Sequence, residues 1–78
     1  MEKAVPQETY DEITKFVESY DGIVGTHDLL VHNYGPGRSM ASIHAEVPND
    51  VNIEVSHEII DRIERDARKY LGIYLFNS

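Results

Sequence analysis

Apolar side chains recur at about every fourth position over one long stretch in the second half of the chain. The set consists of Val55, Ile59, Ile63, Ala67 and Leu71. This spacing is one stripe of an amphipathic α-helix, which buries a single face. Asn52 is a suitable N-cap and Gly72 a suitable terminator, so the pattern predicts a long helix between these two positions.

A second stripe of the same kind lies near the start of the chain. Its members are Tyr10, Ile13, Phe16, Val17 and Tyr20. Thr9 and Glu12 have the spacing of a capping box, and Gly22 stands where a helix C-cap is expected. The pattern predicts a helix over residues 8–20, after a loose lead-in at residues 1–6.

Between the two helical stretches the apolar period shortens. Residues 23–34 are rich in β-branched and apolar side chains, Gly35-Pro36-Gly37 follows, and residues 38–47 alternate between apolar and polar. Two extended runs split by a glycine–proline turn predict a β-hairpin. A short aromatic and β-branched run at residues 73–76 predicts one more strand.

The alternation in the second run assigns its side chains to two faces of a sheet. One face carries Ala41, Ile43, Ala45 and Val47, and the other carries Met40, Ser42, His44 and Glu46. The whole order predicts an α+β fold, a ferredoxin-like αββαβ sandwich with two helices on one face of a three-stranded sheet. Nothing in the chain covers the other face, which invites a partner, and a second copy is the simplest one.

Composition limits the function. The chain has 78 residues, enough for one domain, and no cysteine for a disulfide or a thiolate metal site. A formal net charge of −7 argues against nucleic acid as a partner. No run is apolar enough to insert into a membrane. Enzyme signatures are missing as well, so we assign no catalytic or cofactor-binding residue and expect no enzyme activity.

Histidines and carboxylates remain as candidate ligands. The histidines are His27, His32, His44 and His57. Neutral imidazole binds zinc and several other divalent metals, so histidines from separate elements, with a carboxylate such as Asp28, could converge on one ion. Inert surface histidines are the competing interpretation, and the spacing does not decide between the two.

Strand geometry leaves the grouping of these residues open. Strict alternation places His27 and Asp28 on opposite faces of the first strand. His27 would share a face with His44 only if a bulge interrupted that strand, near Gly25-Thr26. Without a bulge, Asp28 and His44 are the natural pair and His27 lies elsewhere.

Four stretches taken together resemble one known family. They are Gly25-Thr26-His27-Asp28-Leu29, Tyr34-Gly35-Pro36, Ser42-Ile43-His44-Ala45-Glu46-Val47 and Ser56-His57-Glu58-Ile59-Ile60-Asp61-Arg62-Ile63-Glu64. They are similar to the C-terminal cytosolic domain of cation diffusion facilitator transporters, and the resemblance covers almost the whole chain. The αββαβ order is similar to that family's fold.

The resemblance implies a regulatory domain at the cytosolic face of the cell membrane. Family members export divalent cations in exchange for protons through a membrane-embedded segment that precedes this domain. The domain itself is soluble, pairs as a homodimer and responds to metal. By position, His27, His44 and His57 match metal-binding histidines of some members, and Asp28 is the weaker candidate. Zinc is the expected metal, with manganese, iron or other divalent cations as alternatives.

The end of the chain departs from the family pattern. The last strand of the family runs into a His-x-Asp-Pro sequence that completes the metal site, whereas this chain ends Leu75-Phe76-Asn77-Ser78. The resemblance therefore implies one domain over residues 1–78 with a partial metal site. The alternative is a structural dimerisation module with no working metal site.

Overall fold

A computed structural model describes residues 5–32 and 38–77. The elements follow the predicted order: α1 (Gln7–Glu18), β1 (Gly25–His32), β2 (Ser39–Glu46), α2 (Ile53–Asp66), the π-helical turn η1 (Ala67–Leu71) and β3 (Ile73–Asn77). The predicted turn at Gly35-Pro36-Gly37 lies outside the described residues.

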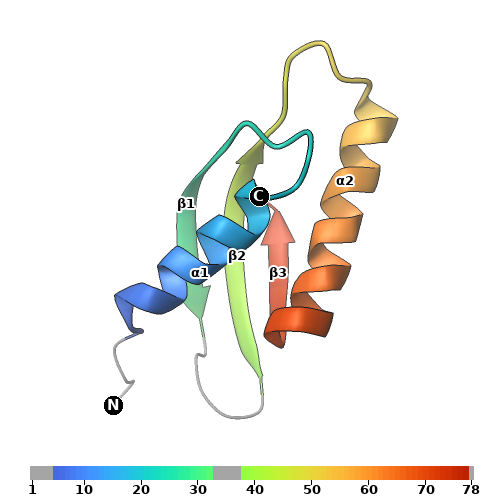
Figure 1. Ribbon diagram of the computed structural model, residues 1–78. Coiled ribbons are helices and arrows are strands. Elements are labelled where there is room, and N and C mark those ends of the chain that lie inside the picture. The colour runs from blue at the N-terminus through green and yellow to red at the C-terminus, as the bar shows by residue number, and fades with distance from the viewer. Residues whose placement is uncertain (1–4, 33–37, 78) are drawn as a thin grey trace.

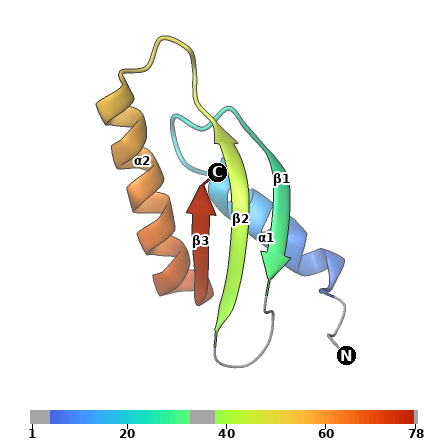
Figure 2. The same cartoon turned by 180° about the vertical axis from the view of Figure 1, so that it is seen from behind.

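The three strands form one sheet in the order β1-β2-β3. β1 and β2 are antiparallel, whereas β3 is parallel to β2, because α2 carries the chain back between them. Both helices lie on one face of the sheet (Figure 1). Seen from behind, the other face has no described element over it (Figure 2). The predicted α+β sandwich is confirmed.

One hydrophobic core lies between the helices and the sheet. Its buried members are Ile13, Val17, Ala41, Ile43, Ile63, Ala67, Ile73 and Leu75. Ala41 and Ile43 belong to the face of β2 that the alternation assigned to the core. Ile63 and Ala67 belong to the four-residue repeat of the second helix. The hydrophobic period of each element thus predicted its buried face.

The predicted helix ends are confirmed for α2 and wrong for α1. The side-chain oxygen of Asn52 accepts a hydrogen bond from the Glu54 backbone N–H at 2.7 Å. Gly72 follows η1 with φ 68°, the left-handed geometry that glycine supplies at a helix C-terminus. The capping box proposed for Thr9 does not form, because α1 begins two residues earlier, with Pro6 at its N-cap.

The segment after α1 is fixed against α2. Gly22 has φ 96°, a conformation that other residues rarely adopt, and a Cβ atom there would lie 2.7 Å from Cδ1 of Ile59, so a larger residue would strain the backbone and displace Ile59. The hydroxyl of Tyr20 donates a hydrogen bond to the carboxylate of Asp66. Burial, together with this hydrogen bond, raises the pKa of Tyr20 to about 12.

Candidate metal site on the uncovered sheet face

A β-bulge in β1 determines where its first histidine lies. The pairing of β1 with β2 shifts between His27 and Leu30, so β1 has one residue more than β2 over this stretch. Asp28 in the bulge has φ 59°, a left-handed conformation that aspartate tolerates better than most side chains. As a result His27 pairs with His44 on the uncovered face of the sheet.

Strict alternation was therefore wrong for His27. The bulge needed to place it beside His44 is present, but it lies at Asp28-Leu29 rather than near Gly25-Thr26. Glycine is the usual residue at a positive φ, and here an aspartate takes that place. The alternative pair of Asp28 with His44 is wrong, because the strand partner of His44 is His27.

The rings of His27 and His44 are in edge-to-face contact near one end of the sheet. Their centroids are 4.7 Å apart and their planes meet at 71°. Carboxylates lie on both sides of His27: its Nδ1 is 3.7 Å from an Asp28 oxygen, and its Nε2 is 3.4 Å from a Glu46 oxygen. The His27 side chain stays 51% exposed, so ions in solution can reach this group.

Sequence reasoning did not select Glu46 as a candidate. The signal was the alternation of β2, which places Glu46 on the same polar face as His44. The contact with His27 depends on the bulge, and for that reason the alternation alone did not bring the two side chains together.

His57 belongs to another part of the molecule. It is exposed on α2, on the helical side of the sheet, whereas the His27–His44 pair lies on the uncovered side. Among residues 5–32 and 38–77, no three His, Asp or Glu side chains are grouped so that they could hold one metal ion. The donors suit a divalent cation, but the described protomer supplies only part of a site.

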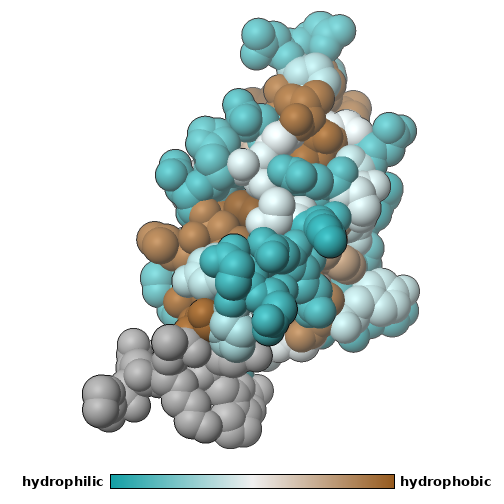
Figure 3. Space-filling view, turned by 60° about the vertical axis from the view of Figure 1, so that its left-hand side comes forward, coloured by the Kyte–Doolittle hydropathy of each residue, from teal (hydrophilic) through white to brown (hydrophobic). Residues whose placement is uncertain are grey.

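Apolar and aromatic side chains share the uncovered face with the histidine pair. By strand register they are Leu30, Met40, Tyr74 and Phe76. Leu30 and Phe76 are at least half exposed. Figure 3, which looks toward the helical side and not onto the uncovered face, shows apolar patches separated by polar side chains there as well. The uncovered sheet face therefore combines metal-type donors with apolar area.

Comparison with known proteins places this arrangement in a family. The sequence profile described as "Cation efflux protein, cytoplasmic domain" matches residues 5–75. The chain belongs to this family. The resemblance found in the sequence is thereby confirmed, and the family is one of transporter domains rather than of enzymes.

Curated relatives in the cation efflux family are much longer than this chain. FieF, a cation-efflux pump of Escherichia coli strain K12, is 32% identical over 65 residues, which cover 83% of this chain and 21% of FieF. FieF of Yersinia enterocolitica is 31% identical with the same coverage. The chain thus spans about a fifth of the length of these relatives. No helix among the described residues is both long and apolar enough to cross a membrane.

Solved structures of cation efflux domains share the fold. A structure of CzrB, described as a putative zinc transporter, has a TM-score of 0.82 at 26% identity and covers 95% of this chain and 93% of that one. The metal-bound C-terminal domain of the CzcD transporter from Thermotoga maritima has a TM-score of 0.77 at 16% identity, with coverage of 99% and 93%. The second likeness supports the fold alone.

Proposed function

We propose that the chain is the homodimerising, metal-responsive domain of a divalent cation efflux transporter, with residues 1–78 forming one domain. The observation that carries the proposal is the bulge that places His27 against His44 on a sheet face that this chain leaves uncovered. Membership in the cation efflux family supports it, because the relatives are named as cation-efflux pumps and zinc transporters.

A second copy of the chain is the proposed cover for the uncovered face. Exposed Leu30 and Phe76, which lie on either side of Ser42 across the sheet, would lose contact with water in a two-fold pair, together with Met40 in the neighbouring row. A chain of this size is only marginally stable alone, and dimerisation adds buried area.

Zinc is the proposed ligand of the histidine pair, because it accepts both imidazole and carboxylate donors. His27 and His44 would bind first, with Glu46 or Asp28 as the oxygen donor and His57 as a weaker contributor. Manganese and iron are alternatives with more preference for oxygen. A metal that binds the dimer better than the monomer shifts the equilibrium by that difference in affinity. Such a response would regulate the transporter's membrane segment.

The second candidate function is a structural dimerisation module. It is favoured by the lack of any three-donor group among the described residues. In that case the same face would pair without any contribution from metal.

Calorimetric titration of zinc and manganese into the chelator-stripped chain separates the two functions. We expect stoichiometric zinc binding that is weakened about a hundredfold in His44→Ala. His32→Ala is the matched control, because His32 is exposed on the same face at the other end of the hairpin and should leave binding unchanged. Metal binding at this pair would be contradicted if the parent gave only background heat, or if both variants lost zinc affinity equally. Either result would favour the structural dimerisation module.

A further inference from the structure

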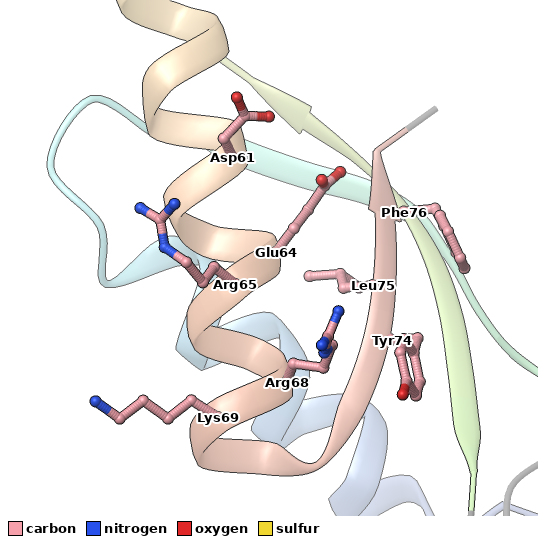
Figure 4. A pocket seen from close by; sticks show the side chains of 8 residues that line it. All are labelled: Asp61, Glu64, Arg65, Arg68, Lys69, Tyr74, Leu75 and Phe76. Atoms are coloured by element: carbon pink, nitrogen blue, oxygen red, sulfur yellow. The ribbon is translucent and has the colours of Figure 1, made fainter.

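A groove of about 730 Å³ lies between α2 and β3, apart from the histidine pair (Figure 4). Three cations, Arg65, Arg68 and Lys69, line it where α2 passes into η1. Tyr74 and Phe76 line it from the strand. Asp61 and Glu64 line it as well, so the groove carries three cations and two carboxylates in a chain whose formal net charge is −7.

These cations are held at the surface without ion pairs to carboxylates of the described residues. The Arg68 guanidinium lies 5.1 Å from the Tyr74 ring centroid, and Arg38 lies 5.3 Å from the same ring. Stacking on an aromatic ring positions a guanidinium while its N–H groups remain directed outward. Arg38, Arg65, Arg68 and Lys69 are all exposed. We call these four residues the η1 cationic patch.

An exposed tyrosine belongs to the same surface. Tyr70 follows Lys69 in η1, is 66% exposed, and has the Lys69 ammonium 5.3 Å from its ring centroid. Tyrosine has an apolar ring and a polar tip, and such side chains gather where a membrane meets water. Cations next to an exposed tyrosine are therefore typical of a surface that contacts lipid headgroups.

Carboxylates reduce the charge of the patch without cancelling it. Asp61 and Glu64 line the same groove, and Glu64 keeps its negative charge while it accepts a hydrogen bond from the Asn77 backbone N–H at 3.3 Å. Asp61 lies one turn before Arg65, about 6 Å along the helix at 1.5 Å per residue. Asp66 is outside the groove lining and accepts a hydrogen bond from Tyr20. The four cations of the patch therefore exceed the two carboxylates of the groove by two charges.

The cations spread outward and do not meet at one point. Figure 4 shows Arg68 directed toward β3, whereas Arg65 and Lys69 point to the other side of the helix. A single phosphate ion would meet only some of them. A surface with many phosphate groups can meet all of them at once, which favours an extended anionic surface over a small anion.

We propose that the η1 cationic patch, with Tyr70, binds a membrane surface that contains anionic phospholipid. The cations contact lipid phosphate groups, and the tyrosine lies at the level of the headgroups, without insertion of a helix. Export of a cation takes place across a membrane, so a cytoplasmic domain of this family has a bilayer as a neighbour. The inference rests on family membership and is independent of the metal site.

Co-sedimentation of the chain with vesicles tests the proposal. The vesicles contain phosphatidylcholine with an increasing fraction of phosphatidylglycerol, at physiological ionic strength. We expect partitioning that rises with phosphatidylglycerol and falls with added salt. The double variant Arg68→Gln/Lys69→Gln should lose about 25-fold, at about fivefold for each basic residue near an anionic surface. Lys15→Gln/Arg62→Gln removes the same charge outside the patch and should lose less than about twofold.

Each other outcome decides against the proposal. No partitioning at any phosphatidylglycerol fraction overturns it, as does an equal loss in both double variants. Titration with inorganic phosphate is the second experiment. If millimolar phosphate causes saturable NMR shifts in the parent but not in the patch variant, and the parent does not bind vesicles, then the ligand is a free anion and the membrane proposal is overturned. Circular dichroism checks that each variant is folded, and Arg38→Gln/Arg65→Gln replaces the first double variant if it is not.

Discussion

The two ends of the sheet place their charged groups in different ways. Where β2 ends, a backbone irregularity brings His27 against His44 and leaves a carboxylate oxygen of Glu46 3.4 Å from an imidazole nitrogen. Where β2 begins, Arg38 and Arg68 lie around one tyrosine ring and the other cations point away. Convergent donors suit one metal ion, whereas spread cations suit a surface with many anions.

The histidine pair and the cationic patch lie at separate ends of the sheet, and Tyr74 belongs both to the uncovered face and to the patch. Tyr74 is level with Met40, four residues before His44 on β2, and four residues of strand span about 13 Å. Substitutions this far apart without shared partners have additive effects. The two ends therefore differ in local charge: carboxylates flank the histidine pair at one end, and cations outnumber carboxylates at the other.

The largest expected effect comes from a core substitution, which should disturb both ends of the sheet because it destabilises the whole domain. Ile43 is 2% exposed and lies in the core beneath the sheet. Ile43→Ala should destabilise the domain by about 3–4 kcal/mol, because it leaves a cavity. Ile53, which is 69% exposed, provides the control, and Ile53→Ala should change stability by less than about 0.5 kcal/mol. Urea denaturation measures both, and similar values for the two variants would contradict the assigned core.

Single alanine substitutions of the paired histidines should change zinc binding at one end of the sheet and leave the other end unaffected. His27→Ala and His44→Ala should each weaken zinc binding by about a hundredfold, because each removes one of two paired imidazoles and about 2.7 kcal/mol of binding free energy. His57→Ala should cost about tenfold or less, since His57 lies on α2. Calorimetry ranks the three, and a larger loss for His57 would move the site to the helical side. Vesicle partitioning should be unchanged in all of them.

The hydrogen bond between Tyr20, just after α1, and Asp66 on α2 is the next target. Its removal tests whether either end of the sheet depends on the contact between the two helices. Tyr20→Phe should cost about 1 kcal/mol at neutral pH, because the hydrogen bond to the Asp66 carboxylate is lost. Tyr10→Phe on the same helix is the control and should be nearly neutral. Neither variant should alter zinc or vesicle binding, and a change in either would contradict the independence of the two ends.

The burial of Tyr20, together with the same hydrogen bond, predicts a pH dependence of stability. The pKa of Tyr20 is raised to about 12 in the folded state, whereas tyrosine in the unfolded chain ionises near pH 10. Between these values the unfolded state loses its proton first, so the contribution of Tyr20 is complete below pH 10 and is lost as pH rises toward about 12. The stability difference between the parent and Tyr20→Phe should narrow over this window. A constant difference would contradict the assignment.

The last prediction concerns the residue that forms the bulge, where Asp28→Gly should have the smallest effect. Asp28→Gly should keep the positive φ and change stability by less than about 1 kcal/mol, whereas Asp28→Val should cost about 1–2 kcal/mol, because a β-branched side chain is strained there. Thermal unfolding measures the pair. Zinc affinity of Asp28→Gly within about threefold of the parent would assign Asp28 a positioning role, and a tenfold loss would make it a ligand.

The regular parts of the fold could be predicted because their signals are local. The face of Ile43, the repeat through Ile63 and the cap at Asn52 each follow from a side-chain period or one nearby hydrogen bond. The position of the bulge could not be predicted in this way, because it depends on which residues of two strands stand opposite each other. Glu46 was missed for the same reason, because its contact with His27 exists only when the bulge places His27 on the uncovered face.

The most direct test of the central claim is the dimer dissociation constant of the chelator-stripped chain, measured by sedimentation equilibrium with and without saturating zinc. We predict a tightening of about five- to 150-fold with zinc, the usual range of coupling between two binding events. The tightening should be absent in His44→Ala and retained in His32→Ala. An equal dissociation constant with and without zinc in the parent chain would contradict a metal-responsive dimer.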